Sequence, residues 1–468
     1  MKNDNKKLNK VLNTGDVLVT AFGAMIGWGW VVSSGNWIQS AGVIGTVIAF
    51  FLGGLMVYFV GMVYAELTTA MPESGGAKVF CQKAFGPIGS FICTWAITLS
   101  YIGVVCFEAC SLPTIIQYIF PNFLKGYLYT VAGFDIYATW LLTAIIFTVL
   151  ITYINIIGVK VAALLQNVLT ITIAIVGIIF VIISTLQGNI ENLNGQIFVG
   201  KESYSILKNI LSVAIVTPFF LFGFDVIPQV AEEINIPFKK LGNLLIFSII
   251  LAVGFYGFIV LAVGYGINTN EITISMSESG LVVADAMAKL LNSTIMAKIM
   301  IIGGMCGIIT SWNSFMIGGS RALMSMASSH MIPNIFSKIH SKYKTPYLAL
   351  ILIGFLSIIS LFFGRKMLIW IANSASFACC ISYCMVSMAF VKLRKVKPEM
   401  ERPFKVKNYK LIGFLSILSS GFMGMIYIIP GTGCTLTNQE FIIVSSWTIL
   451  GIIFMIICKK KYGNKFGK

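Results

Sequence analysis

Long apolar segments alternate with short polar stretches along almost the whole chain. A helix needs about 20 apolar residues to cross the hydrocarbon core of a bilayer, and most of these segments reach that length. The pattern therefore predicts an all-α integral membrane protein. We expect twelve transmembrane helices, at about residues 17–44, 43–70, 88–120, 136–156, 159–186, 206–232, 241–266, 295–326, 346–363, 367–391, 411–429 and 441–458.

The first apolar segment is interrupted near its midpoint by Gly23, Gly27 and Gly29. A glycine weakens a helix interior by about 1 kcal/mol relative to alanine. A backbone that opens in hydrocarbon needs new partners or a wet cavity, because each unpaired N–H or C=O costs several kcal/mol there. We therefore expect a broken helix whose open backbone binds a ligand. The alternative is close helix packing through the Gly23–Gly27 pair, whose spacing is typical of tight helix contacts.

The sixth segment has a second interruption. Pro218 removes a backbone donor and clashes with the preceding turn, and Gly223 and Asp225 follow at membrane depth. The two interrupted segments are five segments apart, so the second enters the membrane from the opposite face. This arrangement predicts an inverted repeat of two five-helix halves, each opened by a broken helix. The expected domains are a basic tail (1–16), the two repeats (17–186 and 206–391), two appended helices (411–458) and a second tail (459–468).

The composition agrees with a membrane protein. Hydrophobic residues make up 57% of the chain and charged residues 11%, whereas soluble domains carry about 25% charged residues. The net charge of +16 comes mainly from Lys and Arg in loops on one side of the expected topology. This bias marks the cytoplasmic side, so we expect both termini in the cytoplasm and no nucleic-acid partner. No cleavable signal peptide is expected, because residues 1–16 are polar and the apolar segment that follows is long.

The two interruptions predict a site built from backbone groups. The amides of Trp28 and Gly29 would begin a half-helix, where the helix dipole attracts an anion such as a carboxylate. The carbonyls of Met25, Phe219 and Phe222 would attract a cation. Donors and acceptors so close together fit a zwitterion, which favours an α-amino acid. The candidate substrate site comprises Gly23, Met25, Ile26, Gly27, Trp28, Gly29, Phe219, Phe222, Gly223 and Asp225.

Four polar side chains are further candidates. Asp225 costs about 2.5–3.5 kcal/mol at bilayer depth, so it either binds a cationic group or a coupling proton, or caps the half-helix that follows it. Glu108 either lines the pocket and contributes to coupling, or pairs with a polar neighbour. Thr310 and Ser311 either supply hydroxyls to a sodium ion or form interhelical hydrogen bonds. The ten cysteines have no histidine near them, so we expect no metal site and no cofactor.

Several motifs, in order along the chain, resemble signatures of the amino acid–polyamine–organocation (APC) family of permeases. They are Gly23–Gly29 in the first segment, Tyr64–Leu67 with Met71–Gly76 after the second, Gly223–Asp225 with Ala231–Pro237 in the sixth, Arg321–Pro333 with Lys344–Pro346 after the eighth, and Arg402–Phe404 after the tenth. The resemblance covers nearly the whole chain. It implies a LeuT-type fold and a proton-coupled or exchanging amino acid transporter of the cell membrane.

Two departures from the family pattern leave its details open. Trp28 stands where the family usually has Ser or Thr, so the amino acid is not identified, although Gly223-Phe224-Asp225 is similar to the cationic amino acid transporter branch. Proton-coupled relatives often have a lysine midway along the fifth segment, which here reads Leu169–Ile173. Sodium coupling, exchange and titration of Asp225 therefore all remain open.

Other functions fit the sequence less well. A polyamine or other organocation permease, or an amino acid exchanger, is the main alternative. A channel lacks a ring of pore-lining acids, and a membrane enzyme lacks a metal or nucleophile–base group. The direction of transport and the oligomeric state are not indicated by the sequence.

Overall fold

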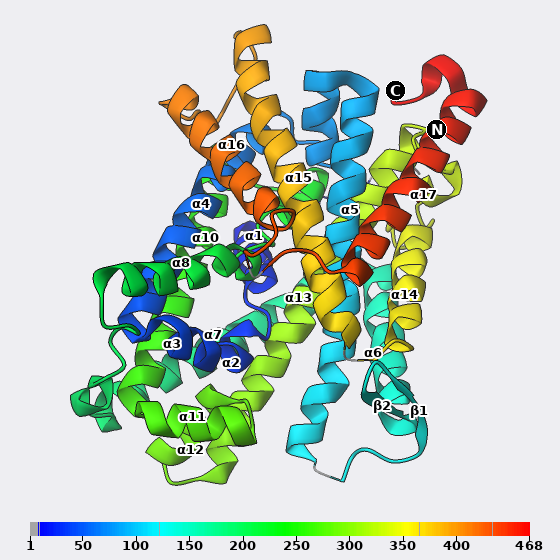
Figure 1. Cartoon of the computed structure of the whole chain (residues 1–468). Coiled ribbons are helices and arrows are strands. Elements are labelled where there is room, and N and C mark those ends of the chain that lie inside the picture. The colour runs from blue at the N-terminus through cyan, green and yellow to red at the C-terminus, as the bar shows by residue number, and fades with distance from the viewer. Residues whose placement is uncertain (1–7, 9, 121, 365, 433) are drawn as a thin grey trace.

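A computed structural model describes residues 8, 10–120, 122–364, 366–432 and 434–468 of the chain. In these residues, eleven helical segments are long and apolar enough to cross a membrane, and a twelfth apolar helix, α14 (Tyr347–Leu361), has 15 residues. The protein is therefore a multi-pass helical membrane protein (Figure 1).

Two of the apolar segments are broken into shorter helices. The first consists of α1 (Thr14–Met25), α2 (Gly29–Val32) and α3 (Ser34–Ala41). The sixth consists of α8 (Ser203–Phe220), α9 (Val226–Gln229) and the 3-10 helix η3 (Ala231–Glu233). Both interruptions lie where the glycines and proline predict them. The other long helices are α4 (Val43–Ala70), α5 (Ala77–Ile119), α6 (Ala138–Ile157), α7 (Val159–Gln187), α10 (Phe238–Gly266), α13 (Thr294–Ser328), α15 (Lys366–Val396), α16 (Tyr409–Ile426) and α17 (Asn438–Tyr462).

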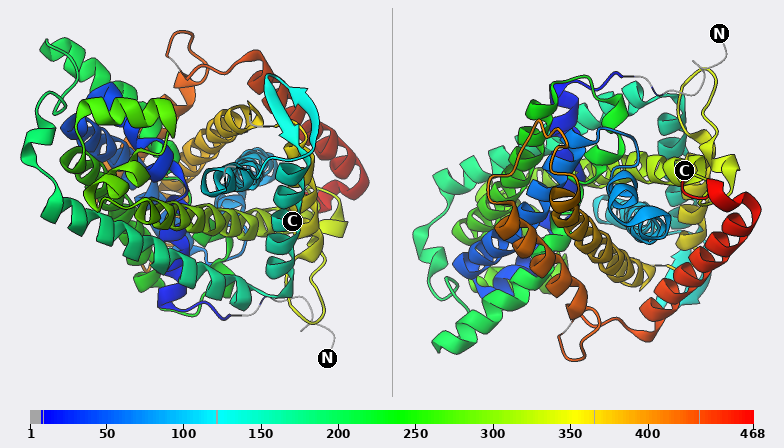
Figure 2. Two further views of the ribbon diagram at one scale, coloured as in Figure 1. Left: turned by 90° about the horizontal axis from the view of Figure 1, so that it is seen from below. Right: turned by 90° about the horizontal axis from the view of Figure 1, so that it is seen from above.

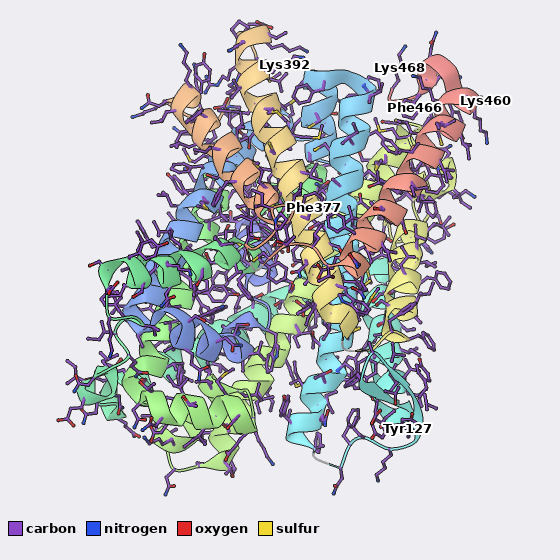
Figure 3. The ribbon with its side chains drawn as sticks, in the orientation of Figure 1. Tyr127, Phe377, Lys392, Lys460, Phe466 and Lys468 are labelled. Carbon is purple, nitrogen blue, oxygen red and sulfur yellow. The ribbon has the colours of Figure 1, made fainter. Side chains whose placement is uncertain are left out.

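One end of the bundle holds small elements that the apolar pattern does not predict. The hairpin of β1 (Tyr127–Val131) and β2 (Phe134–Tyr137) lies there, as do α11 (Thr269–Glu278) and α12 (Val282–Leu290) (Figure 1). Only a helical patch near residues 279–291 is expected from the sequence, and it corresponds to α12. Lys392, Lys460 and Lys468 lie at the opposite end, and Tyr127 lies at the hairpin end (Figure 3). We call these the basic end and the hairpin end.

The long helix α5 is the centre of the packing. It contacts α13, α14 and α15, and views along the bundle show it enclosed by them (Figure 2). It begins eleven residues before the expected start near residue 88, because it continues through a kink at Gly86, whose φ is +73° and which precedes Pro87. The peripheral helix α17 is joined to α5 by Trp95 and Trp447. Their rings stack at 4.3 Å, and each indole N–H donates to the backbone carbonyl of the other.

Buried ion pairs join the helices at the basic end. Arg321 of α13 donates to Glu233 of η3 at 2.8 and 3.2 Å, and both side chains are 1% exposed. Glu66 of α4 pairs with Arg394 at 2.6 Å and with Arg402 at 3.0 Å. The sequence predicts gating or structural ion pairs for Glu66, Arg321 and the Glu232–Glu233 pair, and the structure gives partners for Glu66, Arg321 and Glu233.

Removing one member of the Glu233–Arg321 pair is expected to destabilise the fold. Glu233→Gln leaves the Arg321 guanidinium buried without a counter-charge, which costs about 3–5 kcal/mol. Denaturant unfolding of the protein in micelles measures this loss. Glu73→Gln is the matched control, because Glu73 pairs with Lys83 at 3.5 Å on the surface, and exposed pairs contribute under about 1 kcal/mol. Equal stabilities of the two variants would show that the buried pair does not hold η3 in place.

Candidate functional site

The first interruption opens the backbone between α1 and α2. Within the described residues, the amides of Gly27, Trp28 and Gly29 donate no hydrogen bond to the protein. These three N–H groups begin a new helix, where unpaired donors and the helix dipole favour an anion. The carbonyl of Met25, expected to be free, instead accepts a hydrogen bond from the Tyr256 hydroxyl of α10 at 3.1 Å. A carbonyl oxygen has a second lone pair, so this contact leaves one acceptor position.

The second interruption spans residues 221–225, between α8 and α9. Gly223 has a φ of +131°, which only glycine adopts without strain. The carbonyls of Phe219 and Phe222 accept no hydrogen bond from another described residue. The predicted acceptors of the second interruption are therefore unpaired.

The two interruptions touch each other. A Cβ atom added to Gly223 would lie 2.7 to 3.0 Å from Ala24, at the end of α1. A Cβ atom added to Gly29 would lie 2.4 Å from the ring of Phe220, at the end of α8. Segments about 200 residues apart in the sequence thus bring their open backbones to one place, and both glycines are needed for the approach.

A cavity of about 240 Å³ lies at this meeting point. Eight of the predicted site residues line it: Met25, Gly27, Trp28, Gly29, Glu108, Phe219, Phe222 and Ser311. Most of the other lining side chains are apolar, and the aromatic ones that the sequence did not place in the site are Phe107, Phe220, Tyr256 and Phe315. Aromatic and aliphatic walls with a few polar groups are typical of sites for small organic ligands.

Five predicted residues do not line the cavity. Gly23 packs against Gln166 and Thr170 of α7, which supports the helix-packing alternative at that position. Gly223 lies in the contact between the interruptions, whereas Ile26 is fully buried with its carbonyl beside Gly307 of α13. The Thr310 hydroxyl donates to the Gly307 carbonyl of its own helix at 3.0 Å, so this bond lies within α13 and is not the interhelical bond that was expected. The fifth, Asp225, is held away from the cavity by protein contacts.

Asp225 is 1% exposed and accepts hydrogen bonds from two tyrosines. Tyr101 of α5 donates to Oδ2 at 2.6 Å, and Tyr383 of α15 donates to Oδ1 at 2.9 Å. The carboxylate makes no capping hydrogen bond to α9, although Asp225 is its N-cap residue. Asp225 therefore occupies the expected N-cap position without the side-chain capping bond. The sequence did not identify either tyrosine, because a Tyr inside an apolar helix is equally typical of plain packing.

Glu108 is the one acidic side chain that lines the cavity. It is 3% exposed, and its Oε2 atom has no hydrogen-bond partner among the described residues. Its Oε1 atom lies 3.2 Å from the position of a Cβ added to Gly27, so the carboxyl group is beside the first interruption. Ser311 of α13 lies next to the same glycine and interacts with Glu108. None of the salt bridges in the described residues includes Glu108.

Trp28 fits against α13 because position 304 is a glycine. A Cβ atom added to Gly304 would lie 1.9 Å from the Trp28 ring. The indole is 6% exposed and forms part of the cavity wall. The Trp28 ring therefore lies in the wall of the cavity, against α13.

The cavity continues toward the hairpin end. It shares Ser33, Phe219, Phe220, Ala372 and Ser376 with a second cavity of about 380 Å³. That second cavity is also lined by residues of α3, which packs against α11. At the basic end the buried ion pairs of Glu66 and Glu233 join the helices. The central cavity therefore adjoins a second cavity on its hairpin side.

Comparisons with known proteins found a matching family and several proteins of similar sequence. A family model described as "Amino acid permease" matches residues 12–456. The chain is 25% identical over 476 residues to the branched-chain amino acid permease of Bacillus subtilis (strain 168), covering 98% of this chain and 95% of the relative. It is also 25% identical over 470 residues to the methylthioribose transporter of the same organism, with the same coverage. The aspartate-proton symporter of that organism is 25% identical over 422 residues, covering 88% of this chain and 78% of the relative.

Proposed function

This chain belongs to the amino acid permease family, and we propose that it is a secondary transporter that moves an α-amino acid across the cell membrane by alternating access. The observation that supports this most directly is the contact between two open backbones beside a cavity. The amides of Trp28 and Gly29 would bind the substrate carboxylate. The carbonyls of Phe219 and Phe222, with the second lone pair of Met25, would bind its amino group.

The fold proposed for this function has twelve spans, with α14 as the ninth. Two inverted five-helix repeats, residues 17–186 and 206–391, would meet at the broken helices, as in the LeuT-type arrangement. The basic end would face the cytoplasm, because Lys and Arg favour that side. Both termini would then be cytoplasmic.

The lining of the cavity favours a substrate with an uncharged, mainly apolar side chain. Phe107, Phe315 and Ala375 form walls without a charge. Burying an apolar side chain against such walls removes apolar surface from water, which lowers the free energy by about 25 cal/mol per Å². No Lys or Arg lines the cavity, so an acidic side chain would have no partner there. An amino acid with a cationic side chain is the second candidate, because Glu108 would offer it a carboxylate.

Coupling to protons through Glu108 is the proposed driving mechanism. The carboxyl group is beside Gly27, next to the amides proposed to bind the substrate carboxylate. Two like charges about 4 Å apart repel by roughly 4 kcal/mol at an effective dielectric constant of about 20. Protonation of Glu108 removes this repulsion, so the carboxylate substrate and one proton would bind together. No metal ion or organic cofactor is part of this mechanism.

A binding screen tests the proposal. The purified protein is heated with each of the twenty common amino acids and with polyamines, and the shift of the unfolding temperature is measured. We expect the largest shifts with leucine, isoleucine, valine, methionine or phenylalanine, since ligands stabilise the state that they bind. Largest shifts with lysine, arginine or ornithine would favour the second candidate. Shifts with polyamines alone would contradict an amino acid site.

A further inference from the structure

A groove between α4 and α10 lies on the outer surface of the bundle. The two helices pack against each other (Figure 1). The groove has a volume of about 610 Å³ and shares no lining residue with the central cavity. Its walls are mainly apolar, with Met62 on α4 and Leu244, Phe247 and Ile250 on α10. Phe247 is 47% exposed and Ile250 is 54% exposed, so in a membrane protein this groove opens to lipid.

One end of the groove carries a positive charge. Lys240 lies in the first turn of α10, at the basic end, and lines the groove together with Asn243. Both side chains are exposed, and no salt bridge in the described residues includes Lys240. No described Asp or Glu lines the groove, and the exposed Lys239 adds a second cation beside it. This end of the groove is therefore complementary to an anionic group.

The length of the groove matches one leaflet of a bilayer. Lys240, Leu244, Phe247 and Ile250 follow one another at spacings of three or four residues, so they lie along one face of α10. A helical rise of about 1.5 Å per residue places Ile250 about 15 Å from Lys240 along the helix. Half of the hydrocarbon core of a bilayer is also about 15 Å thick. A ligand with a charged head at Lys240 and an extended apolar chain toward Ile250 would therefore cross that leaflet.

Phe404 joins the groove to the loop that follows α15. Its ring lies over α10 because position 242 is a glycine, where an added Cβ would lie 2.6 Å from the ring. The same loop is bonded to α4, since the amide of Val406 donates to Glu66 at 2.7 Å and Arg402 pairs with Glu66 at 3.0 Å. A ligand in the groove would contact α4, α10 and Phe404 at once, and would stabilise the contact between them.

We infer that this groove binds a phospholipid with an anionic headgroup, in the leaflet at the basic end. The headgroup phosphate accepts hydrogen bonds from Lys240 and Asn243, and one acyl chain lies against Phe247 and Ile250. Basic pockets between transmembrane helices are typical sites for anionic lipid headgroups. The inference goes beyond the proposed transport function and does not depend on it, because the groove is separate from the central cavity.

Photolabelling locates the lipid. The purified full chain in detergent micelles is mixed with a phosphatidylglycerol whose acyl chain carries a diazirine, and labelled peptides are identified by mass spectrometry after irradiation. Residues 243–250 of α10 and 58–62 of α4 should take up about tenfold more label than α17. The apolar side chains of α17 are similarly exposed and serve as the internal control. Equal labelling of α10 and α17 would show only annular lipid and would overturn the site.

Three variants separate the charge from the groove. Lys240→Ala should lower labelling by phosphatidylglycerol about fivefold, which corresponds to the roughly 1 kcal/mol that one lysine contributes near an anionic surface. Labelling by a phosphatidylcholine with the same chain should not change. Lys460→Ala is the matched control, because Lys460 is exposed at the same end and does not line the groove (Figure 3). Leu244→Trp fills the groove and should lower labelling by both lipids about tenfold.

Each part of the inference has its own contrary result. Equal labelling of the unmodified protein by the two lipids would overturn the anionic headgroup. A preference for phosphatidylglycerol that survives in Lys240→Ala would overturn the role of the lysine, and unchanged labelling of Leu244→Trp would overturn the groove. Absence of label on α10 from either lipid, in a protein that elutes as a dimer and is dissociated by Leu244→Trp, would assign the groove to a second copy of the chain.

Discussion

Gly29→Val is expected to reduce amino acid uptake at least roughly 100-fold while the protein still folds and inserts. A side chain at this position would place its Cβ 2.4 and 2.5 Å from two ring atoms of Phe220. That ring packs against Trp37 at 4.8 Å and against Phe219 at 5.2 Å, and it lines the cavity. Either the start of α2 moves or the ring shifts into the cavity, and a displacement of about 1 Å at a binding site can cost about 100-fold in rate.

A matched control separates this effect from general damage to the membrane fold. Gly257 lies in the apolar helix α10, and a Cβ added there meets no atom within 4 Å. Gly257→Val should therefore retain uptake within about twofold of the unmodified protein, since a side chain there meets free space and lies away from the site. Both variants are compared for radiolabelled uptake, expression and elution as a single species. Normal uptake by Gly29→Val would mean that the interruptions do not bind the substrate.

The arrangement of helices was largely predictable, because span length and hydropathy are properties of local sequence. The long apolar segments and both interruptions lie where they are expected, and the match to the amino acid permease family confirms the resemblance seen in the motifs. Among the small elements at the hairpin end, α11 and the hairpin of β1 and β2 were missed, whereas α12 was expected. A local signal existed for α11, whose cap pairs Asn268 with Glu271. The short strands β1 and β2 have no such signal, because a two-stranded hairpin depends on the helices around it.

The candidate site was predictable only where backbone chemistry determines it. Gly27, Trp28 and Gly29 line the cavity because glycine weakens a helix at a definite place. Partners from distant segments could not be inferred from local patterns. Tyr101 is 124 residues from Asp225, and Tyr383 is 158 residues from it. The same limit applies to Met25, whose carbonyl is bonded by Tyr256 from 231 residues away. The binding and coupling roles of the site residues remain predictions.

Glu108→Gln is expected to abolish the ability of a proton gradient to accumulate substrate while exchange of substrate across the membrane continues. The amide has nearly the shape of a protonated carboxyl group, so the repulsion of the substrate carboxylate is removed at every pH. Without a titrating group in the cavity, no proton needs to accompany the substrate. A gradient of one pH unit supports about tenfold accumulation by one-proton symport, because one unit is worth 1.36 kcal/mol. In the variant, the ratio of internal to external substrate concentration should reach only about one.

Proteoliposomes with a pH gradient and a voltage clamp by potassium and valinomycin measure this difference. The unmodified protein should transport faster as the outer pH falls from about 8 to about 5, and the variant should show a flat profile over the same range. Glu191→Gln at an exposed position is the control for loss of one carboxylate and should behave as the unmodified protein does. Asp225→Asn distinguishes the two buried acids. Because Asp225 lies outside the cavity, the transport rate of this variant should depend on pH as it does in the unmodified protein. Gradient-driven accumulation that survives in Glu108→Gln but disappears in Asp225→Asn would show that the coupling proton binds to Asp225 at the second interruption and not to Glu108 of α5.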